Sequence, residues 1–201
     1  MRENALFGLS TPMAVFLSGG GRTLENLLQQ VASGSLSIDV RLVISSSAKV
    51  RGIEVGRKAG IDTRVVLKSR YGTDDAYQEA MFAPCREVGA ELIVMAGFLK
   101  HVLIPGDFTG RVINIHPSLI PAFSGEGMYG MHVHDAAIRR GVQFSGCTVH
   151  FVDNDYDHGP IILQRICSVP KSYSADDLAA AVFELECNAL PEAIRMIQTR
   201  S

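Results

Sequence analysis

Asn114 and His116 are two polar side chains that could act together on a carbonyl group, because they stand two residues apart in an apolar segment that begins at Val112. In a strand, side chains two residues apart leave the same face. A side-chain amide beside an imidazole can stabilise an oxyanion and transfer a proton. Pro117 and Pro121 restrict the loop that follows. We therefore predict that the pair is functional; a polar pair that only caps the strand end is the alternative.

A run of glycines is a second candidate site, for an anion. The segment Ser18-Gly19-Gly20-Gly21-Arg22-Thr23 follows a short apolar run and precedes a helical pattern. Backbone N–H groups of such a turn can approach phosphate oxygens, and the N-terminus of the next helix adds partial positive charge. Arg22 would add a full charge. The turn matches neither G-x-x-x-x-G-K-S/T nor G-x-G-x-x-G, which disfavours ATP and NAD, and a plain tight turn is the alternative.

The other polar segments give weaker signals on their own. Asp153, Asp155 and Asp157 lie close together in one segment, where aspartates are usually solvated turn formers. Their spacing lacks the closing glutamate of an EF-hand, and the six histidines form no H-E-x-x-H motif. We therefore expect no bound metal.

The elements that must position these residues alternate between apolar and amphipathic segments. Fully apolar strands between amphipathic helices indicate a parallel sheet that is covered on both faces. The expected strands are 13–17, 40–45, 63–67, 92–96 and 112–115, and the expected helices are 24–31, 52–59 and 73–88.

The last third of the chain has a different pattern. Residues 147–152 alternate between apolar and polar types, and the apolar segment 161–169 follows after a turn. This pattern predicts a hairpin-like addition to the sheet. A capping-box pattern at 174–177 predicts a final helix to about Ile197, with a kink or break at Pro191.

The composition is that of an ordinary globular domain and excludes several functions. The chain has 201 residues, 47% hydrophobic and 20% charged, so we expect one domain over 1–201 with a lead-in at 1–12. A net charge of −2 argues against a nucleic-acid partner. The longest apolar run, 92–99, is too short to span a membrane, and the first residues lack the apolar stretch of a signal peptide. The four cysteines form no C-x-x-C pair, so we expect free thiols in a cytoplasmic protein. We expect the protein to be a monomer or a homodimer.

Five segments, in chain order, resemble one known family, the folate-dependent formyltransferases. The resemblance runs from about Met13 to Ile197, and its N-I-H-P and D-x-G-P motifs together are highly specific. Ser18–Gly21 is similar to the family's S-G-x-G turn, Ala96–Lys100 to A-G-F-M-R, Asn114–Pro121 to N-I-H-P-S-L-L-P, Gly146–Val152 to G-x-T/S-V-H-F-V, and Asp157–Gln164 to D-x-G-P-I/V-I-L-Q.

The resemblance implies a fold and an activity. The fold would be a single Rossmann-like α/β domain, with a mostly parallel twisted sheet, an antiparallel C-terminal addition and helices on both faces. The activity would be transfer of the formyl group of 10-formyltetrahydrofolate, a small-molecule cosubstrate, to the glycine amine of glycinamide ribonucleotide in purine biosynthesis. Asn114 and His116 would face the formyl carbonyl. Asp157 would pair with the imidazole and raise its pKa.

The same resemblance implies two binding regions and shows several departures. Arg22 and Thr23 replace a pair of small polar residues, Phe183 replaces a polar or basic residue, and Asp74 replaces an arginine that binds the donor's tail. The segment 123–132 replaces a shorter loop. The acceptor would lie on Gly20, Gly21, Arg22, Thr23 and Glu186, and the donor on Leu99, Lys100, His101, Val102, Asn114, Val152 and Asp153.

Related activities remain as alternatives. A 10-formyltetrahydrofolate hydrolase would use the same Asn, His and Asp with water as the acceptor, and usually has a further N-terminal domain. A methionyl-tRNA formyltransferase would need a C-terminal domain and a basic surface, and a sugar-nucleotide formyltransferase, which acts on another amine, is normally longer. Asn114, His116 and Asp157 argue against a catalytically silent nucleotide-binding module.

Overall fold

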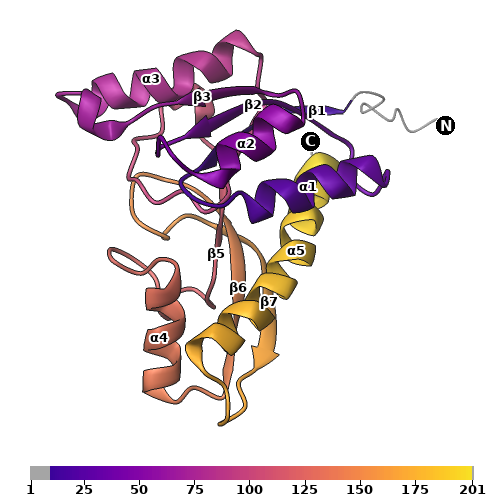
Figure 1. The fold of residues 1–201 in the computed structure, drawn as a ribbon, viewed down its shortest axis with the longest axis vertical. Helices are drawn as coiled ribbons and strands as arrows, with labels where there is room; N and C mark the ends of the chain where they lie inside the picture. Colours follow the sequence, from indigo (N-terminus) through magenta and orange to yellow (C-terminus); the bar gives the residue numbers. More distant parts are fainter. Residues whose placement is uncertain (1–9, 201) are drawn as a thin grey trace.

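Seven strands form one sheet in the order β3-β2-β1-β4-β5-β6-β7 (Figure 1). The computed structural model describes residues 10–200. Strands β1 to β5 pair in parallel, whereas β5, β6 and β7 pair antiparallel, which confirms the predicted sheet. The strands are β1 Thr11–Leu17, β2 Ile38–Ser45, β3 Asp62–Val65, β4 Leu92–Met95, β5 Val112–His116, β6 Phe144–Phe151 and β7 Ile161–Ser168. The helices are α1 Arg22–Ala32, α2 Arg51–Lys58, α3 Asp74–Glu87, α4 Met131–Arg140 and α5 Ala175–Arg200, with short 3-10 turns at Lys68–Arg70 and Gly106–Phe108.

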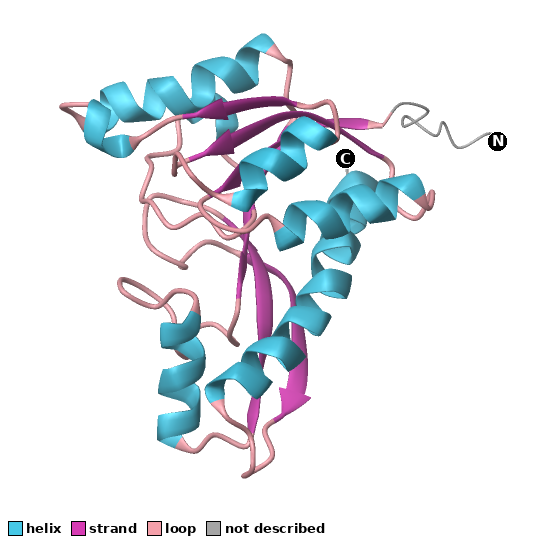
Figure 2. Cartoon of the chain, in the orientation of Figure 1, coloured by secondary structure: helices cyan, strands magenta, loops and turns pink. Residues whose placement is uncertain are grey.

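Helices lie on both faces of the parallel strands, as Figure 2 shows. Helix α3 covers one face, where Phe82 packs edge-on against Phe16 of β1 with 5.7 Å between ring centres. Helices α1 and α5 cover the other face, where Leu24 and Leu190 join Val15 in one apolar cluster. Because side chains alternate along a strand, β1 contributes to both clusters.

Strands β5 and β6 have one apolar face and one polar face. Ile113 and Val149 belong to the apolar cluster that includes α5. The next residues along each strand point the other way. Asn114 and His116 therefore share the second face with His150, which lies opposite Asn114 in the strand register. Three loop segments, 97–102, 125–130 and 152–157, contribute residues to a cavity beside these strands.

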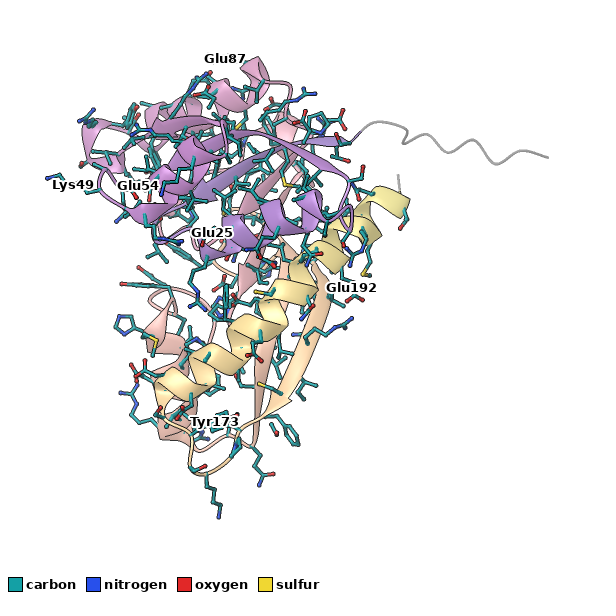
Figure 3. The ribbon with its side chains drawn as sticks, turned by 45° about the vertical axis from the view of Figure 1, so that its right-hand side comes forward. Glu25, Lys49, Glu54, Glu87, Tyr173 and Glu192 are labelled. Atoms are coloured by element: carbon teal, nitrogen blue, oxygen red, sulfur yellow. The ribbon has the colours of Figure 1, made fainter. Side chains whose placement is uncertain are left out.

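The last helix, α5, holds distant parts of the chain together. It contacts α1, α4, β6 and β7, and runs along the length of the molecule in Figure 1. Glu192, labelled in Figure 3, accepts hydrogen bonds from Arg165 of β7. Nearer its end, Gln198 donates to the hydroxyl of Thr11 on β1 over 2.9 Å. The helix therefore fastens the hairpin β6–β7 and the first strand to one body.

Of the predicted kink or break at Pro191, the break does not occur, because helix α5 continues through this residue. A proline cannot donate to the carbonyl four residues earlier, which here belongs to Cys187. That carbonyl accepts a hydrogen bond from Asn26 Nδ2 of α1 over 2.8 Å. The carbonyl that the proline leaves free is thus satisfied by the neighbouring helix.

Other predictions about the elements differ in their outcome. The structure has a helix, α4, where the sequence analysis assigns none, and β1 begins at Thr11, inside the predicted lead-in. Residues 1–9 of that lead-in lie outside the described part. The predicted capping box is confirmed, since Ser174 and Asp177 bond each other reciprocally, and at the start of α3 the N–H of Ala76 donates to Thr73 Oγ1 over 3.2 Å. All four cysteines are free thiols, as expected. Within residues 10–200, no helix combines the length and the apolar character that crossing a bilayer needs.

Candidate active site

A cavity of about 400 Å³ opens beside the polar face of β5 and β6 and extends to the start of α1. Asn114 and His116 line it from β5, and His150 lines it from β6. Helix α5 contributes Phe183 and Glu186. The cavity is therefore bordered by the sheet, by helices α1, α4 and α5, and by loops that follow β4, β5 and β6.

The centre of the cavity brings together the three residues predicted to act on the formyl group. His116 Nδ1 lies 3.3 Å from Asp157 Oδ2, and the side chains are only 4% and 12% exposed. Asn114 Nδ2 lies 3.2 Å from His150 Nε2, and His150 Nδ1 donates to the Phe151 carbonyl over 2.8 Å. His150 therefore accepts from Asn114 and fixes the orientation of its amide. The second N–H of that amide stays available for a ligand.

The short segment before α4 holds both members of the His116–Asp157 pair. His116 Nε2 donates to the carbonyl of Phe123 over 2.8 Å, and the N–H of Gly125 donates to Asp157 Oδ2 over 3.0 Å. Within residues 10–200, the non-glycine residues with a positive φ are Phe123 at 52° and Asp157 at 51°. Backbone in this region is costly for such residues and persists where the surroundings hold it. The strained positions are thus Asp157 itself and Phe123, whose carbonyl holds His116.

Burial has the largest effect on the pKa of His116. Burial lowers the pKa of its imidazole, and the Asp157 carboxylate and the Phe123 carbonyl oppose this only in part. Asp157 therefore raises the pKa of His116, as predicted, but the net shift is downward because burial outweighs the carboxylate. Burial also raises the pKa of Asp157, but the nearby rings of His150 and His116 and the N–H of Gly125 together lower it. At 3.7 Å, His150 Nε2 is too distant from Asp157 for a direct hydrogen bond.

The predicted acceptor region lies between the starts of α1 and α2 and the middle of α5. Gly21 precedes α1 with a left-handed φ of 75°, and a Cβ there would meet Gly52 of α2 at 2.7 Å. Arg22 is exposed and stacks on Phe183, with its guanidinium carbon 3.6 Å from the ring centre. Burial raises the pKa of Glu186 to about 7, and Arg22 partly offsets this. The region therefore combines a permanent cation with a carboxyl group that is partly protonated at neutral pH.

The predicted donor region consists of two loops that are bonded to each other. His101 Nε2 donates to the Asn154 carbonyl over 3.0 Å, and Asn154 Oδ1 accepts from the Ile104 N–H over 2.8 Å. Asp74, which stands where the family has an arginine, pairs with Lys68 Nζ at 2.9 Å. The charge of Lys68 is thus paired with a carboxylate at the position where the family has a cation for the donor's tail.

Asp153, Asp155 and His158 place possible metal ligands within 4.8 Å of one another. His158 Nδ1 lies 2.9 Å from Asp153 Oδ2, and the hydrogen bond to that carboxylate, together with its charge, raises the pKa of the exposed imidazole. An ion pair accounts for their closeness, and the prediction that the chain binds no metal stays untested.

The structure brings most of the predicted site residues to the cavity. Gly20 and Gly21 do not line it, although Arg22 follows them directly. His150 lines it and was not among the predicted site residues; the alternation from Cys147 to Val152, which places it on the face of Asn114, was the available signal. The predicted site residues that line the cavity are Arg22, Thr23, Leu99, Lys100, His101, Val102, Asn114, His116, Val152, Asp153, Asp157 and Glu186.

Comparison with known proteins identifies the family. A family model described as formyl transferase matches residues 12–194. The chain belongs to the formyl transferase family. The motifs quoted above therefore predict the family correctly, and the sheet order places their polar residues around one cavity.

Named relatives within the formyl transferase family act on a phosphoribosyl compound. The chain is 35% identical over 189 residues to a chloroplastic phosphoribosylglycinamide formyltransferase of Vigna unguiculata, covering 92% of this chain and 60% of the relative. It is 33% identical over 173 residues to phosphoribosylglycinamide formyltransferase of Escherichia coli (strain K12), covering 85% of this chain and 79% of the relative. The chain thus spans about three fifths of the length of the plant protein.

Solved structures of formyl transferases share the fold. Glycinamide ribonucleotide transformylase 1 from Symbiobacterium toebii superposes with a TM-score of 0.87 at 32% identity, covering 98% of this chain and 92% of that one. Phosphoribosylglycinamide formyltransferase from Bacillus halodurans gives a TM-score of 0.85 at 29% identity, covering 93% and 95%. The predicted fold is therefore confirmed.

Proposed function

We propose that the chain transfers the formyl group of 10-formyltetrahydrofolate to the glycine amine of glycinamide ribonucleotide. One observation carries the proposal: Asn114, His116 and Asp157 meet at a cavity in a chain of the formyl transferase family. The relatives named for this acceptor match most of the chain, which favours it over water or another amine. The cytoplasmic location and the monomeric or dimeric state stay predictions.

The reaction requires that a tetrahedral oxyanion be stabilised. The free N–H of Asn114 is placed to donate to the formyl oxygen. His116 Nε2 donates to the Phe123 carbonyl, and the formyl oxygen would take the place of that carbonyl. Asp157 would stay at Nδ1 and favour the protonated ring as negative charge develops on the substrate.

Bonds and protons balance without a further reagent. The acceptor nitrogen attacks the formyl carbon and forms the new C–N bond, and the amine proton passes to Asp157, directly or through a water. Collapse of the intermediate breaks the bond from the formyl carbon to the donor nitrogen. That nitrogen takes the proton back from Asp157, directly or through the same water, and leaves as part of tetrahydrofolate. The residues of this chain thus bind, orient and move protons.

The acceptor would be recognised mainly through its phosphate and ribose. We place the phosphate at Gly20, Gly21 and Thr23, where the start of α1 supplies backbone donors and its dipole. Arg22 supplies the charge that the replacement by Phe183 removes. Glu186, further along the cavity wall, accepts hydrogen bonds from hydroxyl groups of the acceptor once it is deprotonated.

The donor would occupy the opposite end of the cavity. Leu99, Lys100, His101 and Val102 form one wall, and Val152 and Asp153 form the other. Asp74 and its partner Lys68 stand where the tail would leave, so we expect little discrimination in favour of polyglutamate tails.

A turnover assay tests the proposal. The purified protein is given 10-formyltetrahydrofolate with glycinamide ribonucleotide, with glycinamide, which lacks the ribose phosphate, or with no acceptor. We expect rapid loss of the donor only with the full acceptor, and a formylated product by mass spectrometry. Equal loss of donor without acceptor would instead identify a hydrolase, and no loss in any reaction would overturn the proposed activity.

A further inference from the structure

His134 of α4 is a buried titratable residue that the proposed reaction leaves without a role. It is 5% exposed and lines the same cavity as His116. Burial lowers the pKa of its imidazole, the charge of Asp135 opposes this, and the charge of His116 adds a smaller lowering effect. His134 therefore lies beside the reacting groups as a neutral imidazole.

The ring of His134 lacks the hydrogen bonds that a buried imidazole normally makes. Its Nδ1 is sealed from solvent without a partner, and neither ring nitrogen bonds to a residue within 10–200. The other buried histidines of the cavity differ, because His116 donates to Phe123 and His150 donates to Phe151. A neutral imidazole has one donor and one acceptor, and leaving either buried without a partner is unfavourable.

Packing alone does not explain a histidine at this position. Its neighbours on the buried side of α4 are Val133 and Ala137, and α4 packs against α5. An apolar side chain of similar size would fill the same space without an unpaired nitrogen. The chain thus keeps an unsatisfied polar ring where the cavity, rather than the protein, can supply the partner.

We propose that His134 binds the amine substrate by forming a hydrogen bond with it through Nε2, the ring nitrogen that is not sealed from solvent. The amine substrate is favoured over the folate because α4 packs against α5, the helix that carries Phe183 and Glu186 on the acceptor side. The donor loops at 99–102 and 152–153 belong to other elements. This inference rests on the proposed function for the identity of the acceptor.

Paired variants separate binding from packing. His134→Phe keeps the size and flat shape of the ring without its nitrogens, and His134→Gln keeps a polar group that can donate and accept. His132→Phe is the matched control, since His132 is exposed on the same helix and does not line this cavity. Michaelis constants for both substrates, kcat and the melting temperature are measured for each protein.

We expect His134→Phe to raise the acceptor Michaelis constant by about 3- to 10-fold, the usual effect of one hydrogen bond. The donor constant should stay unchanged, and the melting temperature should be equal or higher because an unsatisfied buried nitrogen is lost. His134→Gln should recover part of the acceptor affinity. His132→Phe should match the wild type in both constants.

Histidine nitrogen NMR gives a readout that does not need turnover. Adding glycinamide ribonucleotide alone to protein with nitrogen-labelled histidine should move the ring signals of His134, and glycinamide without ribose phosphate should move them less. If the His134 spectrum does not change and His134→Phe has the wild-type acceptor constant, the inference is overturned. The proposed function still stands in that case, provided that the wild type is active. A lower melting temperature of His134→Phe, with both Michaelis constants raised, would also overturn the inference, because it would show that His134 has only a structural role. An inactive wild type would overturn the proposed function and this inference with it.

Discussion

The guanidinium carbon of Arg22 lies 3.6 Å from the centre of the Phe183 ring. These are two positions where the chain departs from the formyltransferase pattern, and the structure places them in contact. A guanidinium over an aromatic face is attracted by the ring and has less freedom to move. Phe183 therefore removes one polar contact from the acceptor region and holds a replacement cation at its edge.

Arg22→Ala should raise the Michaelis constant for glycinamide ribonucleotide by about 10-fold, because a hydrogen bond to a charged group stabilises by roughly 1.5–3 kcal/mol. The donor constant should barely change. Since Arg22 is exposed, the effect should shrink at high salt. Steady-state kinetics at two ionic strengths measures this, with Arg41→Ala on β2 as the control. Equal acceptor constants for wild type and variant at low salt would leave phosphate binding to the backbone and Thr23.

His116→Ala should leave the protein folded and lower turnover by at least about 100-fold, the scale of losing a positioned acid or oxyanion donor. His132→Ala, which changes an exposed histidine outside the cavity, should keep wild-type turnover. Turnover numbers and circular dichroism of the three proteins test this together. Turnover close to normal in a folded His116→Ala protein would remove this residue from the mechanism.

Asp157→Asn should lower turnover about as much as the histidine change, while sparing substrate binding. Asp157 raises the pKa of His116 against the larger effect of burial, so the neutral amide should let that pKa fall further. An unfolded histidine has a pKa of about 6.5. Between that value and the lower folded pKa, the unfolded state binds more protons, so stability falls as pH falls.

The variant should therefore lose stability over a wider range below about pH 6.5 than the wild type. Denaturant unfolding at several pH values measures this, and an NMR titration follows the His116 ring directly. Identical His116 titrations in the two proteins would contradict the pairing of Asp157 with His116.

Glu186→Gln should make the protein more stable at neutral and alkaline pH. Burial raises the pKa of Glu186 from 4.5 to about 7, so the folded state binds a proton more tightly than the unfolded state. This favours folding below the unfolded pKa and is lost as pH rises to about 7. The variant should gain about 1–3 kcal/mol over the wild type above that pH, and the gain should vanish near pH 4.5. A gain that does not depend on pH would show that the carboxyl group is not perturbed.

The sequence predicts the sheet and the reacting residues well because both depend on local pattern. Apolar strands separated by amphipathic segments specify the parallel part, and the two-residue spacing of Asn114 and His116 puts them on one face. Helix α4 was harder to predict because it follows a glycine-rich segment that indicates a loop. The buried Val133 and Ala137, four residues apart, were the available signal.

Other features depend on contacts that no local pattern contains. The effect of Pro191 on α5 is decided by Asn26, which lies far away in the chain and bonds the carbonyl that the proline leaves free. The direction of the His116 pKa shift depends on how deeply the folded chain buries the ring, not on the presence of Asp157. The partners Phe123 and Gly125 act through backbone atoms, so their side-chain types give no sign of their role.

The position of α5 has a consequence for the order of folding during synthesis. This helix leaves the ribosome after all seven strands of the sheet, yet it covers strands from both halves of the sheet and bonds to Thr11 in the first strand. Until it emerges, one face of the early strands stays without its apolar cover. We therefore expect the nascent chain to expose apolar surface, and to need chaperone protection or rapid collapse, until α5 has been synthesised.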